Sequence, residues 1–397
     1  YYGLPYPLPK CDHVAIPDFS AGAMENWGMI TYREMALIAD PDTIAQSSRE
    51  VIVEVISHEL SHQWFGNLVT MKWWDNLWLN ESFANVMAYI AEDALHPDWR
   101  VMDNYIASDG LAALRRDAID GVQSIQTEVN HPDEIGTLFD PSIVYAKGGR
   151  LIFMLINYLG QDAFRKGLNA YFTKHAYGNT TGGDLWAALS EASGQDVAAL
   201  MNPWLERSGY PAVRVNQIGK ELHIEQSHFL MDPTKADAER LWPVPLLSDS
   251  DDVPALLKDK QTTITLHDDR FVRLNKGAIG HYVVQYVNPD HADAIAEQVR
   301  QKTLSIAERL MLLHDSTQLS RAGLQSFGAT LQLLEYYRDE DSEAVWDIVA
   351  LIIADARRFI DIHPELEDEI KALLRELVET QYRRLGWEPI EGEAAQD

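Results

Sequence analysis

Cysteine is nearly absent from this sequence, which has a single one, Cys11, in 397 residues. One cysteine cannot form an internal disulfide, so a disulfide-stapled scaffold and a cysteine zinc cluster are excluded. No apolar run approaches the roughly 18 residues that a membrane-spanning helix needs, and no signal peptide opens the chain. Because the first residue is Tyr1 rather than methionine, we expect the natural start and any targeting segment to lie upstream. A cytoplasmic location is therefore only the default expectation.

Positive charge is also scarce. The chain has 33 Lys and Arg residues against 61 Asp and Glu residues, a formal net charge of −28. This balance argues against the phosphate-binding surface of a nucleic-acid-binding protein. We interpret the acidity, which is spread along the chain, mainly as a source of solubility. Hydrophobic residues make up 46% of the sequence, and the length suggests two or three globular domains.

Hydrophobic periodicity divides the chain into three regions. Up to about Tyr210 apolar residues recur mostly at helical spacing, although AGAMENWGMITYRE at 21–34 ends in a pattern typical of a strand. Between Pro211 and about Pro289 the period falls toward two. This predicts strands at 212–217, 221–226, 261–269, 271–275 and 281–287. Helical periodicity then returns and ends in a polar tail at 388–397.

The motif HELSH at 58–62 gives the first indication of chemistry. His58 and His62 lie at positions i and i+4 of a helical pattern, so their rings face the same way and can converge on one ion. Glu59 is rotated by about 100° and would reach a metal-bound water more easily than the metal itself. The alternative is an ordinary helix with two hydrogen-bonded histidines and an exposed capping glutamate.

A catalytic zinc ion needs a third protein ligand and one open position for water. The candidate is Glu81, which follows His62 by 19 residues at the start of a second helical segment. Two packed helices would then supply all three ligands. This favours the metal site over the ordinary helix.

Four motifs follow one another along the chain: GAMEN at 22–26, HELSH at 58–62, NE at 80–81 and VYAKGG at 144–149. In these motifs and their spacing the sequence resembles the zinc aminopeptidases of the aminopeptidase N type. The resemblance covers essentially the whole chain. A thermolysin-like endopeptidase shares the zinc motif but is not expected to contain GAMEN.

The resemblance implies a role for each matching residue. His58, His62 and Glu81 would bind one zinc ion (Zn2+) per chain, which activates water and polarises the scissile carbonyl. Glu59 would be general base toward that water and then general acid toward the leaving amine. Tyr145 would donate its hydroxyl to the oxyanion of the tetrahedral intermediate. Without the resemblance, Tyr145 would be an ordinary aromatic residue at the start of a helix.

GAMEN would recognise the free N-terminus of the substrate. An α-amino group is largely cationic at neutral pH and pairs with a carboxylate. The resemblance assigns this contact to Glu25, assisted by Glu81, while Gly22 and Ala23 would offer backbone groups as an edge strand does. Taken alone, the stretch is a turn-like lead into a strand. The candidate substrate-binding residues are Gly22, Ala23, Met24, Glu25 and Asn26.

The ends of the chain depart from the family pattern. Family members usually have a β domain before this region and a longer helical domain after it. We therefore expect a central fragment that lacks the N-terminal β domain and part of the C-terminal helical domain. Those missing domains are expected partners of the chain, and amine affinity and substrate enclosure would depend on them.

The predicted fold class is α+β. It comprises a thermolysin-like, mainly helical zinc domain at 1–210, a small antiparallel β-sandwich at 211–290 and a partial α-helical domain at 291–397. The predicted function is removal of single residues from peptides with a free N-terminus, without a nucleic-acid partner or a membrane segment. Two alternatives stay open: a catalytically silent peptide-binding module of this fold, and a zinc endopeptidase. Intact Glu59 and Tyr145 argue against the first, and Glu25 against the second.

Overall fold

The computed structural model describes residues 1–387. Its first half is mainly helical, as the sequence predicts. The helices of this half are α1 (Gln46–His62), α2 (Trp78–Leu95), α3 (Val101–Tyr105), α4 (Leu111–Asp117), α5 (Gly148–Leu159), α6 (Gln161–His175), α7 (Gly182–Ser193) and α8 (Val197–Glu206). Two short strands, β4 (Val69–Met71) and β5 (Gly178–Thr180), pair in parallel between them.

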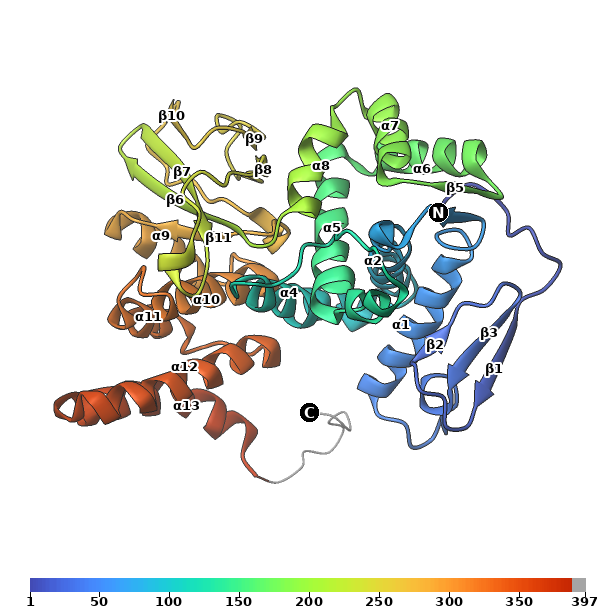
Figure 1. Ribbon diagram of the computed structural model, residues 1–397. Coiled ribbons are helices and arrows are strands. Elements are labelled where there is room, and N and C mark those ends of the chain that lie inside the picture. The colour runs from blue at the N-terminus through green and yellow to red at the C-terminus, as the bar shows by residue number, and fades with distance from the viewer. Residues whose placement is uncertain (388–397) are drawn as a thin grey trace.

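A three-stranded sheet lies beside α1 (Figure 1). Its strands are β1 (Asp12–Ile16), β3 (Met29–Arg33) and β2 (Ala23–Met24), in that spatial order. β2 runs antiparallel to β3, with Ala23 opposite Tyr32 and Met24 opposite Thr31. Part of the GAMEN motif therefore forms an edge strand, and its outer side has no strand partner among the described residues.

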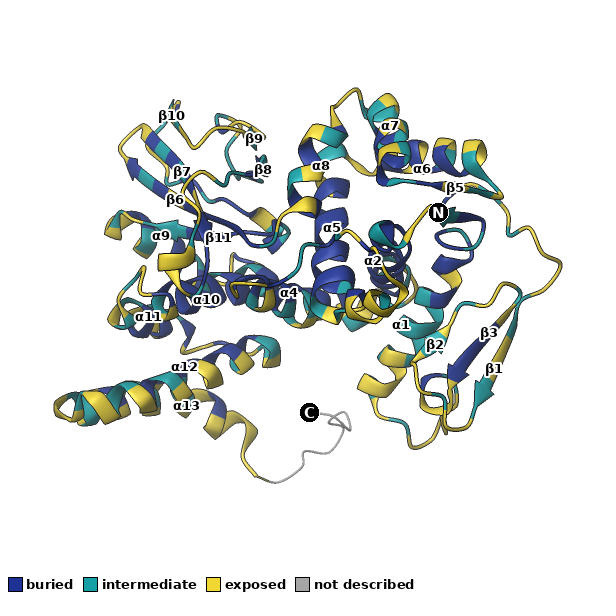
Figure 2. Cartoon of the chain, viewed as in Figure 1, coloured by how far each residue is buried: buried dark blue, intermediate teal, exposed yellow. Residues whose placement is uncertain are grey.

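Helix α2 forms the centre of the helical region. Buried residues account for 13 of its 18 positions, because it is apolar on nearly every side and is enclosed by α1 and α5 (Figure 2). Two glycines of α5 allow a close approach to α2. A Cβ atom at Gly148 would lie 2.0 Å from Ser82 Oγ, and one at Gly149 would lie 2.4 Å from Asn85 Oδ1. Any larger residue there would push the two helices apart.

The second region forms a four-stranded sheet on the other side of the helices (Figure 1). Its spatial order is β10 (Gln261–Thr265), β7 (Glu221–Phe229), β6 (Tyr210–Ile218) and β11 (Val283–Tyr286). The prediction of purely antiparallel pairing is wrong for β11, which runs parallel to β6. A hairpin would impose antiparallel pairing, but β11 follows β10, which lies at the opposite edge of the sheet, and the connection between them crosses the sheet and brings β11 in parallel to β6. β8 (Val244–Pro245) and β9 (Leu256–Leu257) form a separate antiparallel pair.

The strand predicted at 271–275 is wrong as well, since these residues form no strand. Three of their backbone N–H groups donate to side chains instead of to a neighbouring strand. Val272 donates to Gln217 Oε1 at 2.9 Å, and Leu274 donates to the Tyr286 hydroxyl at 3.1 Å. The alternating pattern was real, but its backbone donors found other acceptors.

The last region is helical, as predicted. It contains α9 (Pro289–Arg300), α10 (Ile306–Arg321), α11 (Phe327–Leu334), α12 (Glu343–Ile362) and α13 (Glu367–Leu385). The polar tail predicted at 388–397 lies outside the described residues. Buried apolar side chains form one continuous cluster from Tyr2 to Leu377, so the three regions pack against one another. Among the described helices, none combines the length and apolar character that crossing a bilayer requires.

A fully buried polar cluster connects the helical region to the four-stranded sheet. Asp117 Oδ2 lies 2.9 Å from Lys147 Nζ and 3.0 Å from His281 Nε2. Asp117 Oδ1 accepts the Gly209 N–H at 2.8 Å, and Lys147 Nζ donates to the Arg207 carbonyl at 3.0 Å. Burial lowers the pKa of His281 to about 4. Burial would raise the pKa of Asp117, but Lys147 and His281 lower it to about 2.

We expect Asp117→Asn to lower the free energy of unfolding by about 3–5 kcal/mol, because Lys147 would stay buried without a charged partner. Urea unfolding at pH 7 measures this loss. Because the pKa of Asp117 is lower in the folded state, its contribution is present above pH about 4 and is lost toward pH about 2. The control is Glu367→Gln, which removes an exposed ion pair with Lys371 and should change stability little. Equal effects of the two variants would contradict the prediction.

Candidate metal centre and active site

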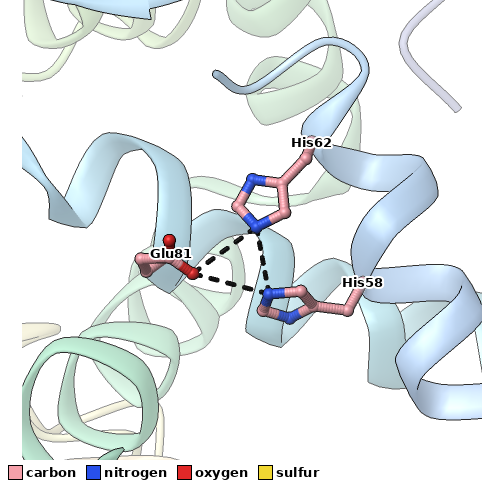
Figure 3. A group of neighbouring side chains, drawn as sticks. All are labelled: His58, His62 and Glu81. Atoms are coloured by element: carbon pink, nitrogen blue, oxygen red, sulfur yellow. Dashed lines mark hydrogen bonds and ion pairs between the residues drawn. The ribbon is translucent and has the colours of Figure 1, made fainter. Parts of the chain in front are cut away.

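Two helices bring His58, His62 and Glu81 together (Figure 3). Both histidines lie in the last two turns of α1, and Glu81 lies in the first turn of α2. His58 Nε2 and His62 Nε2 are 3.0 Å apart. Glu81 Oε2 lies 3.5 Å from the first nitrogen and 3.4 Å from the second. Among the described residues, this is the one group of three or more His, Cys, Asp or Glu side chains that converge closely enough to bind a metal ion.

The surroundings orient these three donors. His62 Nδ1 lies 3.0 Å from the Phe65 carbonyl, which can only accept a hydrogen bond. The Nδ1 atom therefore bears the proton, and Nε2 is left with its lone pair toward the centre. Glu81 lies at the N-terminal end of α2, where the helix dipole favours a carboxylate. The local fold thus presents two imidazole nitrogens and one carboxylate oxygen to a common point.

The electrostatics of the site favour a cation. Burial opposes protonation of His62, but the carboxylates around it, Glu81 foremost, outweigh burial and raise the pKa of His62 to about 10. Burial would raise the pKa of Glu81, but the two histidines lower it well below its ordinary value. In contrast, burial lowers the pKa of His58. The carboxylates thus favour a positive charge at the place where the donor atoms converge.

Glu59 lies on the same helix, between the two histidines. It is 5% exposed, and its Oε2 atom is buried without a hydrogen-bond partner among the described residues. Burial, together with Glu25 and Glu81, raises the pKa of Glu59 to about 8. An unpaired buried carboxylate oxygen costs free energy unless a water or a substrate group completes it. A carboxylate oxygen that is free to accept a proton, with a pKa near the working pH, is what a general base requires.

Tyr145 lies beside the three converging side chains, with its ring centroid 6.1 Å from that of His58. The sequence predicts an ordinary helix here, but Pro141–Lys147 forms a π-helical turn (η6), a rare geometry that is frequent at functional sites. The Ser82 hydroxyl donates to the Val144 carbonyl at 2.6 Å, which ties this turn to the residue after Glu81. Burial and the nearby Glu81 carboxylate raise the pKa of Tyr145, so its hydroxyl stays protonated.

The GAMEN residues lie along the edge strand and the turn that follows it. Glu25 comes directly after β2, and it lies close enough to raise the pKa of both Glu59 and His62. The side chain of Asn26 is occupied within the turn, where its amide donates to Thr31 Oγ1 at 3.2 Å. Met24 is 40% exposed, and a Cβ atom at Gly22 would meet nothing within 4 Å. The space beside Gly22 is therefore open.

The structure thus brings the predicted metal ligands together with Glu59, Tyr145 and Glu25. Sequence reasoning missed the residues that fix them in place. Ser82 and Lys147 support the turn that contains Tyr145, while Gln63 and Asn67 contact the backbone of Glu25. A signal was present, because Gln63 and Asn67 are polar residues within the mostly apolar stretch QWFGNLV.

Comparison with known families assigns the chain. A model of the peptidase family M1 domain matches residues 1–204, which is more than half of the sequence. The chain belongs to peptidase family M1. This match confirms the resemblance to the aminopeptidase N type. A second family model, of an ERAP1-like C-terminal domain, matches residues 271–397.

Several relatives extend the match to family M1 over the whole chain. Aminopeptidase N of Lactococcus lactis subsp. lactis (strain IL1403) is 44% identical over 404 residues, and that of Lactobacillus helveticus is 42% identical over 405 residues. Aminopeptidase M1-B of Oryza sativa subsp. japonica is 39% identical over 414 residues. Each alignment covers all of this chain and 47% of the relative. The chain therefore spans about half the length of the curated relatives it matches.

Proposed function

We propose that this chain contains the catalytic site of a zinc aminopeptidase that removes single residues from peptides with a free N-terminus. One observation supports this function above all others. Three donor atoms from α1 and α2 converge on one point, and the carboxylate of Glu25 lies close enough to raise the pKa of His62 and Glu59, so a metal centre and an amine-binding group would flank the same space. The names of the family M1 relatives point to the same activity.

Zinc fits the donor set. A tetrahedral ion with bonds of about 2.0–2.2 Å to nitrogen and oxygen requires donor atoms about 3.3–3.5 Å apart. The separations among His58 Nε2, His62 Nε2 and Glu81 Oε2 are 3.0, 3.4 and 3.5 Å. Two imidazoles and one carboxylate are also a donor set typical of catalytic zinc, with a fourth position left for substrate or water. Zinc, when bound, supplies Lewis-acid activation of water and of the peptide carbonyl.

Glu59 would move the proton. Its carboxylate takes a proton from the attacking water and later delivers it to the nitrogen of the leaving amine. The pKa of about 8 reflects burial and neighbouring carboxylates, and a nearby cation would favour the ionised form that a base needs. Both proton transfers thus use the Glu59 side chain, whose pKa burial and the neighbouring carboxylates bring close to neutral pH.

Tyr145 would bind the oxyanion of the scissile peptide group, and Glu25 would bind the substrate ammonium group. The Tyr145 hydroxyl, which stays protonated, donates to the oxyanion that develops from the scissile carbonyl. The Glu25 carboxylate pairs with the substrate ammonium group, aided by Glu81. Because the ammonium group must reach Glu25, only the first peptide bond lies over the metal centre.

The test is hydrolysis of a matched pair of substrates: an aminoacyl arylamide with a free amine, and its N-acetylated twin. We expect the zinc-loaded protein to cleave only the free-amine member, because the acetyl group removes the charge that Glu25 binds. A chelator should abolish this cleavage, and added zinc should restore it.

The other outcomes separate the alternatives. Cleavage of both substrates would point to an endopeptidase and remove the argument for Glu25. Cleavage of neither, with zinc bound, would favour a silent peptide-binding module or a requirement for further domains. The zinc content of each sample is measured together with its activity.

A further inference from the structure

Two side-chain amides from the metal-binding segment meet the backbone of Glu25. We propose that Asn67, assisted by Gln63, is a positioning residue that sets where the amine-binding carboxylate lies relative to the metal centre. This inference rests on the proposed aminopeptidase function. It adds a determinant of the preference for a free N-terminus that lies outside the GAMEN motif.

The contacts are direct. Asn67 Nδ2 donates to the Glu25 carbonyl at 2.7 Å, and Gln63 Nε2 donates to the same oxygen at 3.3 Å. Gln63 Nε2 also donates to the carbonyl of Glu59 at 3.0 Å, and the residue is 1% exposed. One carbonyl thus accepts from two amides that lie 42 and 38 residues further along the chain.

Asn67 is itself attached to a metal ligand. Its backbone N–H donates to the His62 carbonyl at 3.0 Å. Gly66 makes this possible, because its φ of 122° turns the chain after α1 in a conformation that other residues rarely adopt. Two hydrogen bonds therefore connect His62 to Glu25 through a single residue.

Glu25 needs such a support. The register of β2 with β3 ends at Met24, so Glu25 is the first residue beyond the paired edge. Without the two amides, its carbonyl would have no hydrogen-bond partner that the described structure supplies. A displacement of about 1 Å in a group that orients a substrate can cost about 100-fold in rate. The clamp formed by Asn67 and Gln63 therefore fixes the position of Glu25, the proposed amine-binding residue, and takes no part in the chemical step.

The variant that tests this is Asn67→Asp, which keeps the shape of the side chain but replaces the amide donor by a carboxylate oxygen. Its matched control is Asn169→Asp. Asn169 Nδ2 donates in the same manner to the Tyr2 carbonyl, at 3.0 Å, and has a similar intermediate exposure. Both variants remove one amide-to-carbonyl bond that fastens the N-terminal segment, but only Asn67 contacts Glu25.

The readout is calorimetric binding of two probes to zinc-loaded protein: leucine hydroxamate, and isocaproic hydroxamate, which lacks only the amine. The ratio of their affinities reports amine recognition, while the second probe alone reports the metal centre. We expect the ratio of leucine hydroxamate affinity to isocaproic hydroxamate affinity to fall about tenfold in Asn67→Asp, which is about the largest effect that the loss of one hydrogen bond has. The ratio should stay unchanged in Asn169→Asp. Affinity for isocaproic hydroxamate and zinc content should stay at the wild-type level.

A wild-type ratio in Asn67→Asp, or an equal loss for both probes, would overturn the inference. If Asn67→Asp does not fold, Asn67→Ala removes the donor without adding a charge, and the same two criteria apply. The proposed function would fail differently. In that case the wild-type protein would itself bind both probes equally, and it would cleave the free-amine and the N-acetylated substrate alike or cleave neither.

Discussion

Glu59→Gln is expected to lower kcat by about 10²- to 10⁴-fold, the usual contribution of a general base. Glutamine has nearly the same shape, but it cannot accept a proton from water at neutral pH. The metal ligands remain, so zinc content should stay at one ion per chain. Turnover of an aminoacyl arylamide and elemental analysis of the same sample measure the two quantities.

Glu92 provides the matched control for Glu59. It is 2% exposed, its Oε1 atom is buried without a partner among the described residues, and burial with Glu54 and Glu50 raises its pKa to about 7. Glu92→Gln makes the same chemical change about three turns beyond Glu81 on α2 and should leave kcat near the wild-type value. A comparable loss in both variants would mean that burying a neutral amide, rather than losing a base, causes the effect.

Tyr145→Phe should lower kcat by about 10²- to 10³-fold, because one donor to the oxyanion is lost. The KM value should change little, since the hydroxyl acts on charge that develops only in the transition state. Steady-state kinetics on the free-amine arylamide separate the two constants. A rise in KM with an unchanged kcat would instead assign Tyr145 to substrate binding.

Tyr105→Phe controls for removal of a buried hydroxyl. Tyr105 is fully buried on α3, and its hydroxyl has no hydrogen-bond partner within residues 1–387. Removing that oxygen leaves no group unpaired, so both stability and kcat should be preserved. A loss of kcat in Tyr145→Phe but not in Tyr105→Phe would therefore show that the position of the Tyr145 hydroxyl matters, and not just the removal of a buried hydroxyl.

Local patterns in the sequence predicted that His58, His62 and Glu81 converge, but they could not predict the tertiary contacts around them. His58 and His62 face the same way because of helix geometry, which their separation of four positions already fixes. The clamp of Asn67 on Glu25 depends on how the edge strand packs beside α1, and no periodicity encodes a contact across 42 residues. The roles of these residues in turnover stay predictions until the variants are measured.

The failures among the strands have the same origin. Residues 271–275 alternate as a strand does, yet three of their N–H groups donate to the side chains of Gln217, Asp249 and Tyr286. Alternation reports which side chains are buried, not which acceptor each backbone donor finds. Likewise, the parallel direction of β11 follows from a connection that crosses the sheet from β10 to the opposite edge, a path that the sequence does not reveal.

The buried Asp117 cluster sets a minimum size for an autonomous peptidase unit. The family M1 model ends at residue 204, but the groups that satisfy Asp117 and Lys147 include Arg207, Gly209 and His281. Excision at the family boundary would strip those partners from a charged pair that lies two residues from Tyr145. Residues that precede strands β6 and β11 thus help to hold the π-helical turn that contains Tyr145, and the folding unit extends beyond the end of the family match.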